Sequence, residues 1–219
     1  MPLVLASASP RRRELLRQAG YTFTVHPAHI PEDPLPNEDP IAYVTRLARQ
    51  KAETVFAEIT RSHTNKELGA PGPDSGTWES TNLNDTEDLS ELIVLGADTT
   101  VVIDNQILEK PAEAADAARM LRLLSGRTHR VITGVAVVTA HRTEVAAEVT
   151  GVRFLTLSEE EIAAYIATGE PMDKAGAYAI QGRAARWIPR ITGDYFNVVG
   201  LPLALVSTML EALASMRPS

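Results

Sequence analysis

The sequence predicts an α/β fold built on a mixed β-sheet with flanking helices. Three observations lead to this prediction. Short apolar runs alternate with helix-like patterns through the first half of the chain, which is typical of strand–helix units. Two long segments, 131–139 and 144–157, then look like antiparallel partners that turn near His141-Arg142. The chain of 219 residues suits one large domain, or two small lobes that share a core.

Local signals mark the ends of several elements. Ser9 is a good N-cap, Pro10 fits the first helical position, and Gly20 supplies a stop for that helix. Ser158 and Glu161 have the spacing of a capping box. In chain order we expect a strand at 3–6, a helix at 9–19, a strand at 21–25, a proline-rich loop at 26–38, a helix from 39, a strand at 92–97, a strand pair at 101–108, a helix at 111–124, a helix from 158 to 169 and a closing amphipathic helix at 203–214.

Residues 61–91 differ in composition from the rest of the chain. They are rich in Ser, Thr, Asn, Asp, Gly and Pro and contain few apolar residues. We therefore expect a single domain over 1–219 with a flexible surface insertion at 61–91. The alternative is an ordered lid with a functional role.

Charge and composition exclude several classes of function. The net charge of −7 argues against a general affinity for nucleic acid or an anionic membrane, and 5% aromatic content argues against base-stacking platforms. With no cysteine in the chain, disulfides, thiolate zinc sites and cysteine nucleophiles are excluded. Neither a signal peptide nor a membrane-spanning apolar run is recognisable, so we expect a cytoplasmic protein. An anionic substrate would require positive charge that is concentrated locally.

A candidate phosphate site lies where the first strand gives way to a helix, at Ser7-Ala8-Ser9-Pro10-Arg11-Arg12-Arg13. A helix N-terminus presents free N–H groups and a partial positive charge. Three arginines there oppose the helix dipole, and an anionic ligand would remove that cost. The alternative is a capped surface helix whose arginines are solvated.

Three charged residues elsewhere are candidates for chemistry. Asp98 follows a strongly apolar strand and is expected at its end, where it could bind a metal, act as a general base, or simply cap a turn. Lys51 lies inside the apolar stripe of the second helix, where it could neutralise phosphate or extend to solvent. Lys110 precedes a predicted helix and has the same two interpretations.

The glycine-rich segment 169–182 is the last candidate. Its glycines allow close backbone approach to a ligand, and Gln181 carries both a donor and an acceptor that could read a base edge. A glycine-punctuated turn is the alternative. The sequence contains neither of the glycine-rich nucleotide loops G-x-G-x-x-G and G-x-x-x-x-G-K-[ST], no G-x-S-x-G elbow, and no histidine cluster with metal-ligand spacing.

Together these segments closely resemble the Maf family of nucleoside triphosphate pyrophosphatases. The matching pieces occur in the family's order and span nearly the whole chain outside 61–91. They are Ser7-Ala8-Ser9-Pro10-Arg11-Arg12, Leu47-Ala48-Arg49-Gln50-Lys51-Ala52, Gly96-Ala97-Asp98-Thr99, Glu109-Lys110-Pro111, Ser125-Gly126-Arg127-Thr128-His129, Asp173-Lys174-Ala175-Gly176-Ala177-Tyr178, Gln181-Gly182 and Asn197-Val198-Val199-Gly200-Leu201-Pro202.

The resemblance implies an elongated mixed sheet, two lobes around a central cleft, and cleavage of a nucleoside triphosphate between its α- and β-phosphates with Mg²⁺ or Mn²⁺. Asp98 matches the family's proposed general base, and the other expected catalytic residues are Glu32, Lys51 and Lys110. Glu32 and Asp98 are also the expected metal ligands. The expected substrate-binding residues are Ser7, Ser9, Arg11, Arg12, Thr99 and Gln181.

The resemblance further implies a preference for dTTP and UTP, because Arg12, Thr99 and Gln181 match positions associated with that branch of the family. The sister branch, which prefers 7-methyl-GTP, typically has tryptophan where this chain has Arg11. Ala179 stands where glycine is usual, and the long insertion is atypical. A homodimer is also implied.

Two other functions stay open at this point. A non-catalytic nucleotide-binding regulator of cell division or septum formation would keep the arginines but would not need a water-orienting carboxylate. A nucleic-acid-binding module is opposed by the charge of −7 and the few aromatic residues.

Overall fold

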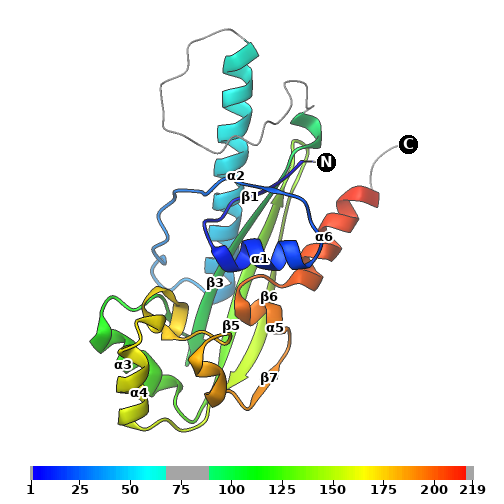
Figure 1. The fold of residues 1–219 in the computed structure, drawn as a ribbon. Helices are drawn as coiled ribbons and strands as arrows, with labels where there is room; N and C mark the ends of the chain where they lie inside the picture. Colours follow the sequence, from blue (N-terminus) through cyan, green and yellow to red (C-terminus); the bar gives the residue numbers. More distant parts are fainter. Residues whose placement is uncertain (1, 68–88, 216–219) are drawn as a thin grey trace.

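A seven-stranded mixed sheet forms the centre of the molecule (Figure 1) in a computed structural model that describes residues 2–67 and 89–215. Within those residues the strand order is β2-β1-β3-β5-β6-β7, and β4 pairs with β3. Strands β2, β1 and β3 run parallel, and all other pairs are antiparallel. The strands are β1 Leu3–Leu5, β2 Thr24–Val25, β3 Ile93–Ile103, β4 Gln106–Leu108, β5 Thr128–Val138, β6 Thr143–Arg153 and β7 Arg190–Thr192. The mixed sheet predicted from the sequence is confirmed.

The helices begin at residues whose side chains or rings suit a helix start. The side chain of Ser9 accepts a hydrogen bond from the Arg12 amide ahead of α1, and Ser158 with Glu161 forms the predicted capping box ahead of α4. The α-helices are α1 Pro10–Gln18, α2 Pro40–Glu67, α3 Ala114–Leu124, α4 Glu159–Ile166, α5 Tyr195–Val199 and α6 Leu203–Ser215. Short 3₁₀ turns lie at Leu89–Glu91, Glu170–Asp173, Ala175–Ala177 and Arg183–Trp187.

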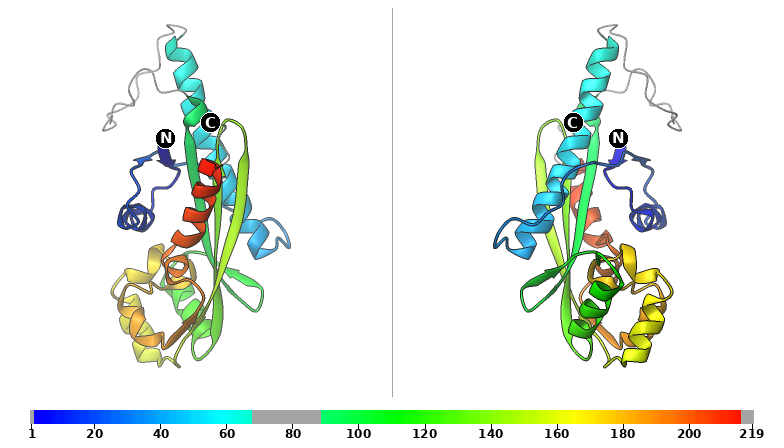
Figure 2. Two further views of the ribbon diagram at one scale, coloured as in Figure 1. Left: turned by 90° about the vertical axis from the view of Figure 1, so that its right-hand side faces the viewer. Right: turned by 90° about the vertical axis from the view of Figure 1, so that its left-hand side faces the viewer.

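Successive side chains along a strand point to opposite faces of the sheet, so each face has its own hydrophobic core. In β3, Val94 packs in a cluster with Ala48, Ala52 and Val55 of α2. Its neighbour Leu95 packs in a cluster with side chains of α1 and α6 on the opposite face. The edge-on views of Figure 2 show the sheet between these helices.

Helix α2 lies unusually close to the sheet because glycines stand beneath it. A Cβ atom on Gly96 would lie 2.1 Å from the carbonyl oxygen of Ala48, and one on Gly134 would lie 2.3 Å from that of Val44. Only a residue without a side chain fits these positions. The close contact fixes the height of α2 above β3 and therefore the place of the side chains that α2 presents there.

The long strands carry the chain from one lobe to the other. Strands β3, β5 and β6 each have 11 residues, and their lower ends reach a second lobe formed by α3, α4 and the 3₁₀ turns between Glu170 and Trp187 (Figure 1). A separate buried cluster fills this lobe and contains Phe154, Tyr165 and Trp187. The fold is thus the elongated two-lobed arrangement that the sequence resemblance implies.

Three expectations about element boundaries need correction. Asp98 does not end a strand, because β3 continues to Ile103 and pairs with β5 along nearly its whole length. The helix expected at 111–124 begins at Ala114. Helix α2 continues through Glu67, well into the segment expected to be an insertion. Within it, the hydroxyls of Thr60, Ser62 and Thr64 donate hydrogen bonds to the carbonyl oxygens four residues earlier. The remainder of that expected insertion, residues 68–88, lies outside the described residues.

Among the described residues, no helix combines the length and the apolar character that crossing a membrane requires.

Candidate active site

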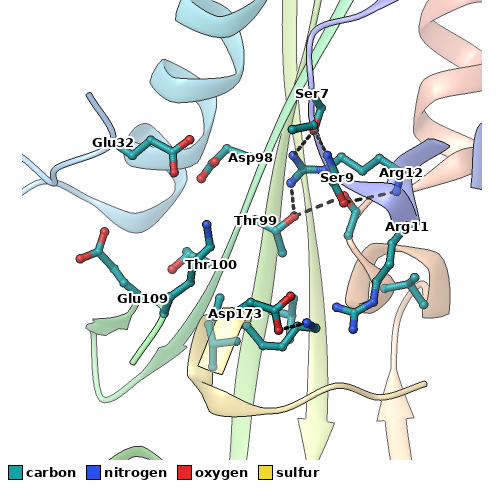
Figure 3. A pocket seen from close by; sticks show the side chains of 18 of the residues that line it. Ser7, Ser9, Arg11, Arg12, Glu32, Asp98, Thr99, Thr100, Glu109 and Asp173 are labelled. Carbon is teal, nitrogen blue, oxygen red and sulfur yellow. Dashed lines mark hydrogen bonds and ion pairs between the residues drawn. The ribbon is translucent and has the colours of Figure 1, made fainter. Parts of the chain in front are cut away.

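A cavity of about 790 Å³ opens where the two lobes meet (Figure 3). Its wall comes from the β1–α1 junction, from α2, from the middle of β3, from the segment after β4 and from the turns around residue 175. The charged and hydroxyl-bearing residues that line it are Ser7, Ser9, Arg11, Arg12, Glu32, Tyr43, Lys51, Asp98, Thr99, Thr100, Glu109, Lys110, Asp173, Lys174 and Tyr178.

The cavity exists because one edge of β3 is left open at its middle. Strand β5 covers one edge of β3 from Val94 to Val102. On the other edge, β1 pairs with residues 93–95 and β4 pairs with residues 101–103. Residues 96–100 lie between these two partners, and Asp98, Thr99 and Thr100 of this stretch line the cavity.

Asp98 takes part in a cluster of three charged side chains. The Nζ atom of Lys51 lies 2.7 Å from Oδ1 of Asp98 and 2.6 Å from Oε1 of Glu32. The side chains of Lys51 and Asp98 are only 9% and 11% exposed, whereas that of Glu32 is 48% exposed. The amine of Lys51 therefore remains inside the protein, and its alternative interpretation as a lysine that extends to solvent is wrong.

The position of Lys51 follows from the packing of α2. Ala48 rests on Gly96, and one helical turn later Lys51 stands beside Asp98, two residues further along β3. The expected proline-rich loop brings Glu32 to the same place. Arg46 of α2 holds this loop in place, because it pairs with Glu38 at 2.6 Å and donates a hydrogen bond to the carbonyl oxygen of Asp33.

Positive charge dominates the surroundings of Glu32. Its partial burial works to raise the pKa of Glu32, but the hydrogen bond from Lys51 and the charges of Lys51, Lys110 and Arg12 outweigh burial, so the pKa is lowered. Glu32 is therefore a carboxylate near neutral pH.

The N-terminus of α1 forms the opposite wall of the cavity. Ser7 and Ser9 lie at this terminus, and the Ser9 amide donates to Oγ of Ser7 at 3.2 Å. The guanidinium of Arg12 is buried, and its N–H groups donate to backbone and hydroxyl oxygens. These are the carbonyls of Gly200 and Ala97 at 2.9 and 2.8 Å, Oγ of Ser7 at 3.2 Å and Oγ1 of Thr99 at 3.0 Å. Burial lowers the pKa of Arg12, and the negative charges of Asp98 and Glu32 oppose that shift.

The remaining predicted residues occupy different places. Arg11 and Lys110 line the cavity, and Arg11 points toward Asp173 (Figure 3). Asp173 forms an ion pair with Lys174. Gln181 is exposed and is not among the residues that line the cavity.

Sequence reasoning missed three polar residues of the cavity wall, which are Tyr43, Thr100 and Glu109. The hydroxyl of Tyr43 lies 2.8 Å from both the Glu32 carbonyl oxygen and Oε1 of Glu109, so it joins the loop of Glu32 to the segment that follows β4. Thr100 is buried on the Asp98 side of β3, and its hydroxyl has no hydrogen-bond partner within the described residues. One signal was available, because Tyr43, Leu47 and Lys51 are spaced four residues apart and share one face of a helix.

Comparison with known proteins shows the family of this chain. The model of the family described as Maf-like protein matches residues 2–213 of the chain. The chain belongs to the Maf family. Its relatives include a protein of Koribacter versatilis that is 50% identical over 211 residues, covering 96% of this chain and 94% of the relative. A Bacillus pumilus relative is 43% identical over 95% of both chains, and a Salmonella typhimurium relative is 43% identical over 98% of this chain and 94% of its own length.

All three relatives carry the name dTTP/UTP pyrophosphatase. As a Maf chain, the protein is a nucleotide pyrophosphatase, a hydrolase that acts on the phosphate anhydride of a nucleoside triphosphate. The cavity between the lobes has carboxylates on one wall and a helix N-terminus on the other, a combination that suits the binding of phosphate groups.

Proposed function

We propose that this chain hydrolyses dTTP and UTP to the nucleoside monophosphate and pyrophosphate with the help of Mg²⁺ or Mn²⁺, and that the cavity at the middle of β3 is its active site. The observation that carries the proposal is the cluster of Asp98, Lys51 and Glu32 opposite the N-terminus of α1. A carboxylate that can accept a proton thus faces a set of cations that can bind phosphates.

Asp98 is the proposed general base. It accepts a proton from a water molecule whose oxygen forms a bond to the α-phosphorus, while the bond from that phosphorus to the bridging oxygen of pyrophosphate breaks. Lys51, Lys110 and the amides at the start of α1 bind the phosphate oxygens, with Ser7, Ser9 and Arg11 beside them. Arg12 supports the phosphate site by holding Ser7 and Thr99 in place.

The donor set at Glu32 and Asp98 fits a divalent cation that prefers oxygen ligands. Both side chains lie within hydrogen-bond distance of one shared Lys51 nitrogen, so their oxygens are close together. Mg²⁺ is commonly held by one or two carboxylates together with substrate phosphates. When bound, the metal would offset negative charge on the phosphates and on the departing pyrophosphate.

A preference for pyrimidine triphosphates is part of the proposal, and it rests on the relatives' name and on Arg12, Thr99 and Gln181. Pyrophosphate release should be measured with dTTP, UTP, CTP, ATP and GTP. A kcat/KM for purine triphosphates that is tenfold above that for dTTP and UTP would contradict the preference. Nucleotide binding without any pyrophosphate release would instead favour the non-catalytic regulator.

The role of Asp98 is tested by Asp98→Asn. This change keeps the shape of the side chain but removes the proton acceptor, so kcat should fall by about 10²-fold or more while nucleotide affinity falls less. The melting temperature should also fall, because Lys51 loses one partner of a buried ion pair. Asp104→Asn makes the same chemical change at the exposed β3–β4 turn and should leave kcat unaltered. A near-normal kcat for Asp98→Asn would remove Asp98 from the mechanism.

We further propose that the protein works as a homodimer in the cytoplasm on free nucleotides, and not on nucleic acid or membranes. The net charge of −7 argues against nucleic-acid and anionic-membrane partners, and the lack of cysteine suits a cytoplasmic location. The dimer is what the family resemblance implies. Light scattering coupled to size-exclusion chromatography tests the dimer, because a single species near 24 kDa would contradict it, given the chain mass of 23.7 kDa.

A further inference from the structure

The cation nearest to Glu32 and Asp98 belongs to the protein itself. Lys51 Nζ lies 2.6 Å from one carboxylate and 2.7 Å from the other, and its side chain is 9% exposed. The two acidic side chains come from different elements, a loop and β3, and Lys51 of α2 joins them. This lysine thus occupies the position between the two carboxylates that would hold the metal ion.

A divalent cation cannot share that position with the ammonium group. A metal bound to both carboxylates needs their oxygens at about 2.0–2.1 Å for Mg²⁺, and those oxygens already point at Nζ. Two cations confined to the same small, mostly buried space also repel each other strongly. Metal binding to the pair therefore requires Lys51 to leave it.

The protein also offers few other ligands. No group of three or more His, Cys, Asp or Glu side chains that could hold a metal ion occurs in the part of the chain that the structure describes. A carboxylate pair alone is a weak site for Mg²⁺, which then depends on substrate phosphates for further ligands. Nucleotide phosphates would supply these oxygens and would also give the Lys51 amine a new anionic partner.

We propose that Lys51 is a built-in counter-ion that keeps divalent cations off the Glu32–Asp98 pair until a nucleotide arrives, so that the metal enters together with the triphosphate. The inference rests on the proposed function, since it assumes that this pair binds the catalytic metal. The side chain of Lys51 changes partners, while α2 stays fixed on Gly96. The enzyme without nucleotide therefore does not hold a resident metal ion.

Metal binding without catalysis is the direct test. Free Mn²⁺ is titrated into the protein and followed by electron paramagnetic resonance, first alone and then with saturating α,β-methylene-dUTP, which has no cleavable α–β anhydride bond. We expect the wild-type protein to bind Mn²⁺ at least tenfold more tightly with the analogue than without it. Mn²⁺ bound by the analogue in solution is measured separately and subtracted.

Substitutions of Lys51 then show whether its positive charge, or only the space that its side chain fills, keeps Mn²⁺ away from the two carboxylates. Lys51→Met should bind Mn²⁺ at least tenfold more tightly than wild type without nucleotide, whereas Lys51→Arg keeps the charge and should stay as weak as wild type. Lys174→Met is the matched control. It removes a cation that lines the same cavity but pairs with Asp173, and it should leave the affinity for Mn²⁺ alone unchanged.

Two results would overturn the inference: tight Mn²⁺ binding to the wild-type protein without nucleotide, or Lys51→Met binding Mn²⁺ no more tightly than wild type. If Lys51→Met does not fold, the wild-type titrations with and without the analogue decide alone. Failure of the proposed function is recognised separately, because it appears as the absence of pyrophosphate release from every triphosphate with every metal.

Discussion

Substitution of Gly96 by alanine should damage both the fold and the active site, although this residue carries no chemistry of its own. A Cβ atom at this position would lie 2.1 Å from the Ala48 carbonyl oxygen and 3.0 Å from both the backbone nitrogen and the Cβ of Ala52. An ordinary carbon–oxygen contact is about 3.3 Å or more, so α2 must move away from β3 by on the order of 1 Å. The clash involves backbone, which cannot rotate aside.

The size of both effects can be estimated from that shift. Overpacking of this kind costs roughly 3 kcal/mol, which corresponds to a decrease of about 6–12 °C in melting temperature for a domain of this size. Lys51 lies one turn beyond Ala48, so the same shift separates it from Asp98. Misplacement of a catalytic group by about 1 Å can cost on the order of 10²-fold in rate.

The assay compares Gly96→Ala with a substitution of a glycine two strands away in the same sheet. A Cβ atom on Gly151 of β6 would have its nearest neighbours at 3.8 Å, an ordinary contact distance, so Gly151→Ala should melt and turn over substrate like wild type. Thermal melting and pyrophosphate release from saturating dTTP are measured for both. Wild-type melting and kcat in Gly96→Ala would refute the view that close packing of α2 positions Lys51.

Two further predictions concern residues that were not among the expected site residues. Tyr43→Phe removes the hydroxyl that contacts the Glu32 carbonyl and Glu109, so we expect kcat to fall about tenfold and the metal concentration for half-maximal activity to rise, with little change in KM for dTTP. The control is Tyr195→Phe at an exposed position, and an unchanged metal requirement in Tyr43→Phe would contradict the role of Tyr43 in holding the loop of Glu32. Burial lowers the pKa of His129 to about 3, below its unfolded value near 6.5. The unfolded chain therefore binds the extra proton first, and the free energy of unfolding should fall by up to about 1.4 kcal/mol per pH unit as pH decreases from 6.5 toward 3. Chemical denaturation at pH 7 and pH 5 checks this slope, and the slope should become shallower in His129→Gln.

Local sequence signals determined much of the fold. The serine caps ahead of α1 and α4, the apolar runs of β1 and β3 and the long paired strands β5 and β6 are marked by signals that act over a few residues, so the chain itself specifies them. The ends of elements were less well predicted. Asp98 interrupts an apolar run and looks like a strand end, yet the strand continues because β5 supplies a partner along nearly all of β3.

The sequence and its family resemblance predicted most of the charged residues that the fold brings to the cavity, but they did not predict the geometry. Lys51, Glu32 and Asp98 are far apart in the chain, and nothing local specifies that one amine contacts both carboxylates. The same limit applies to Arg12, which is expected from the sequence to bind substrate from a first helical turn and which the fold buries against the backbone of Ala97 and Gly200.

The physical reason lies in the range of the interactions involved. Helix caps, turn residues and hydrophobic periodicity are short-range, and a single sequence displays them directly. Burial, ion pairing and the open edge of β3 depend on which elements meet, and here that depends on two glycines that let α2 rest on the sheet. The sequence determined which residues carry the charge of the site, and the tertiary structure alone determined that Lys51 stands between Glu32 and Asp98.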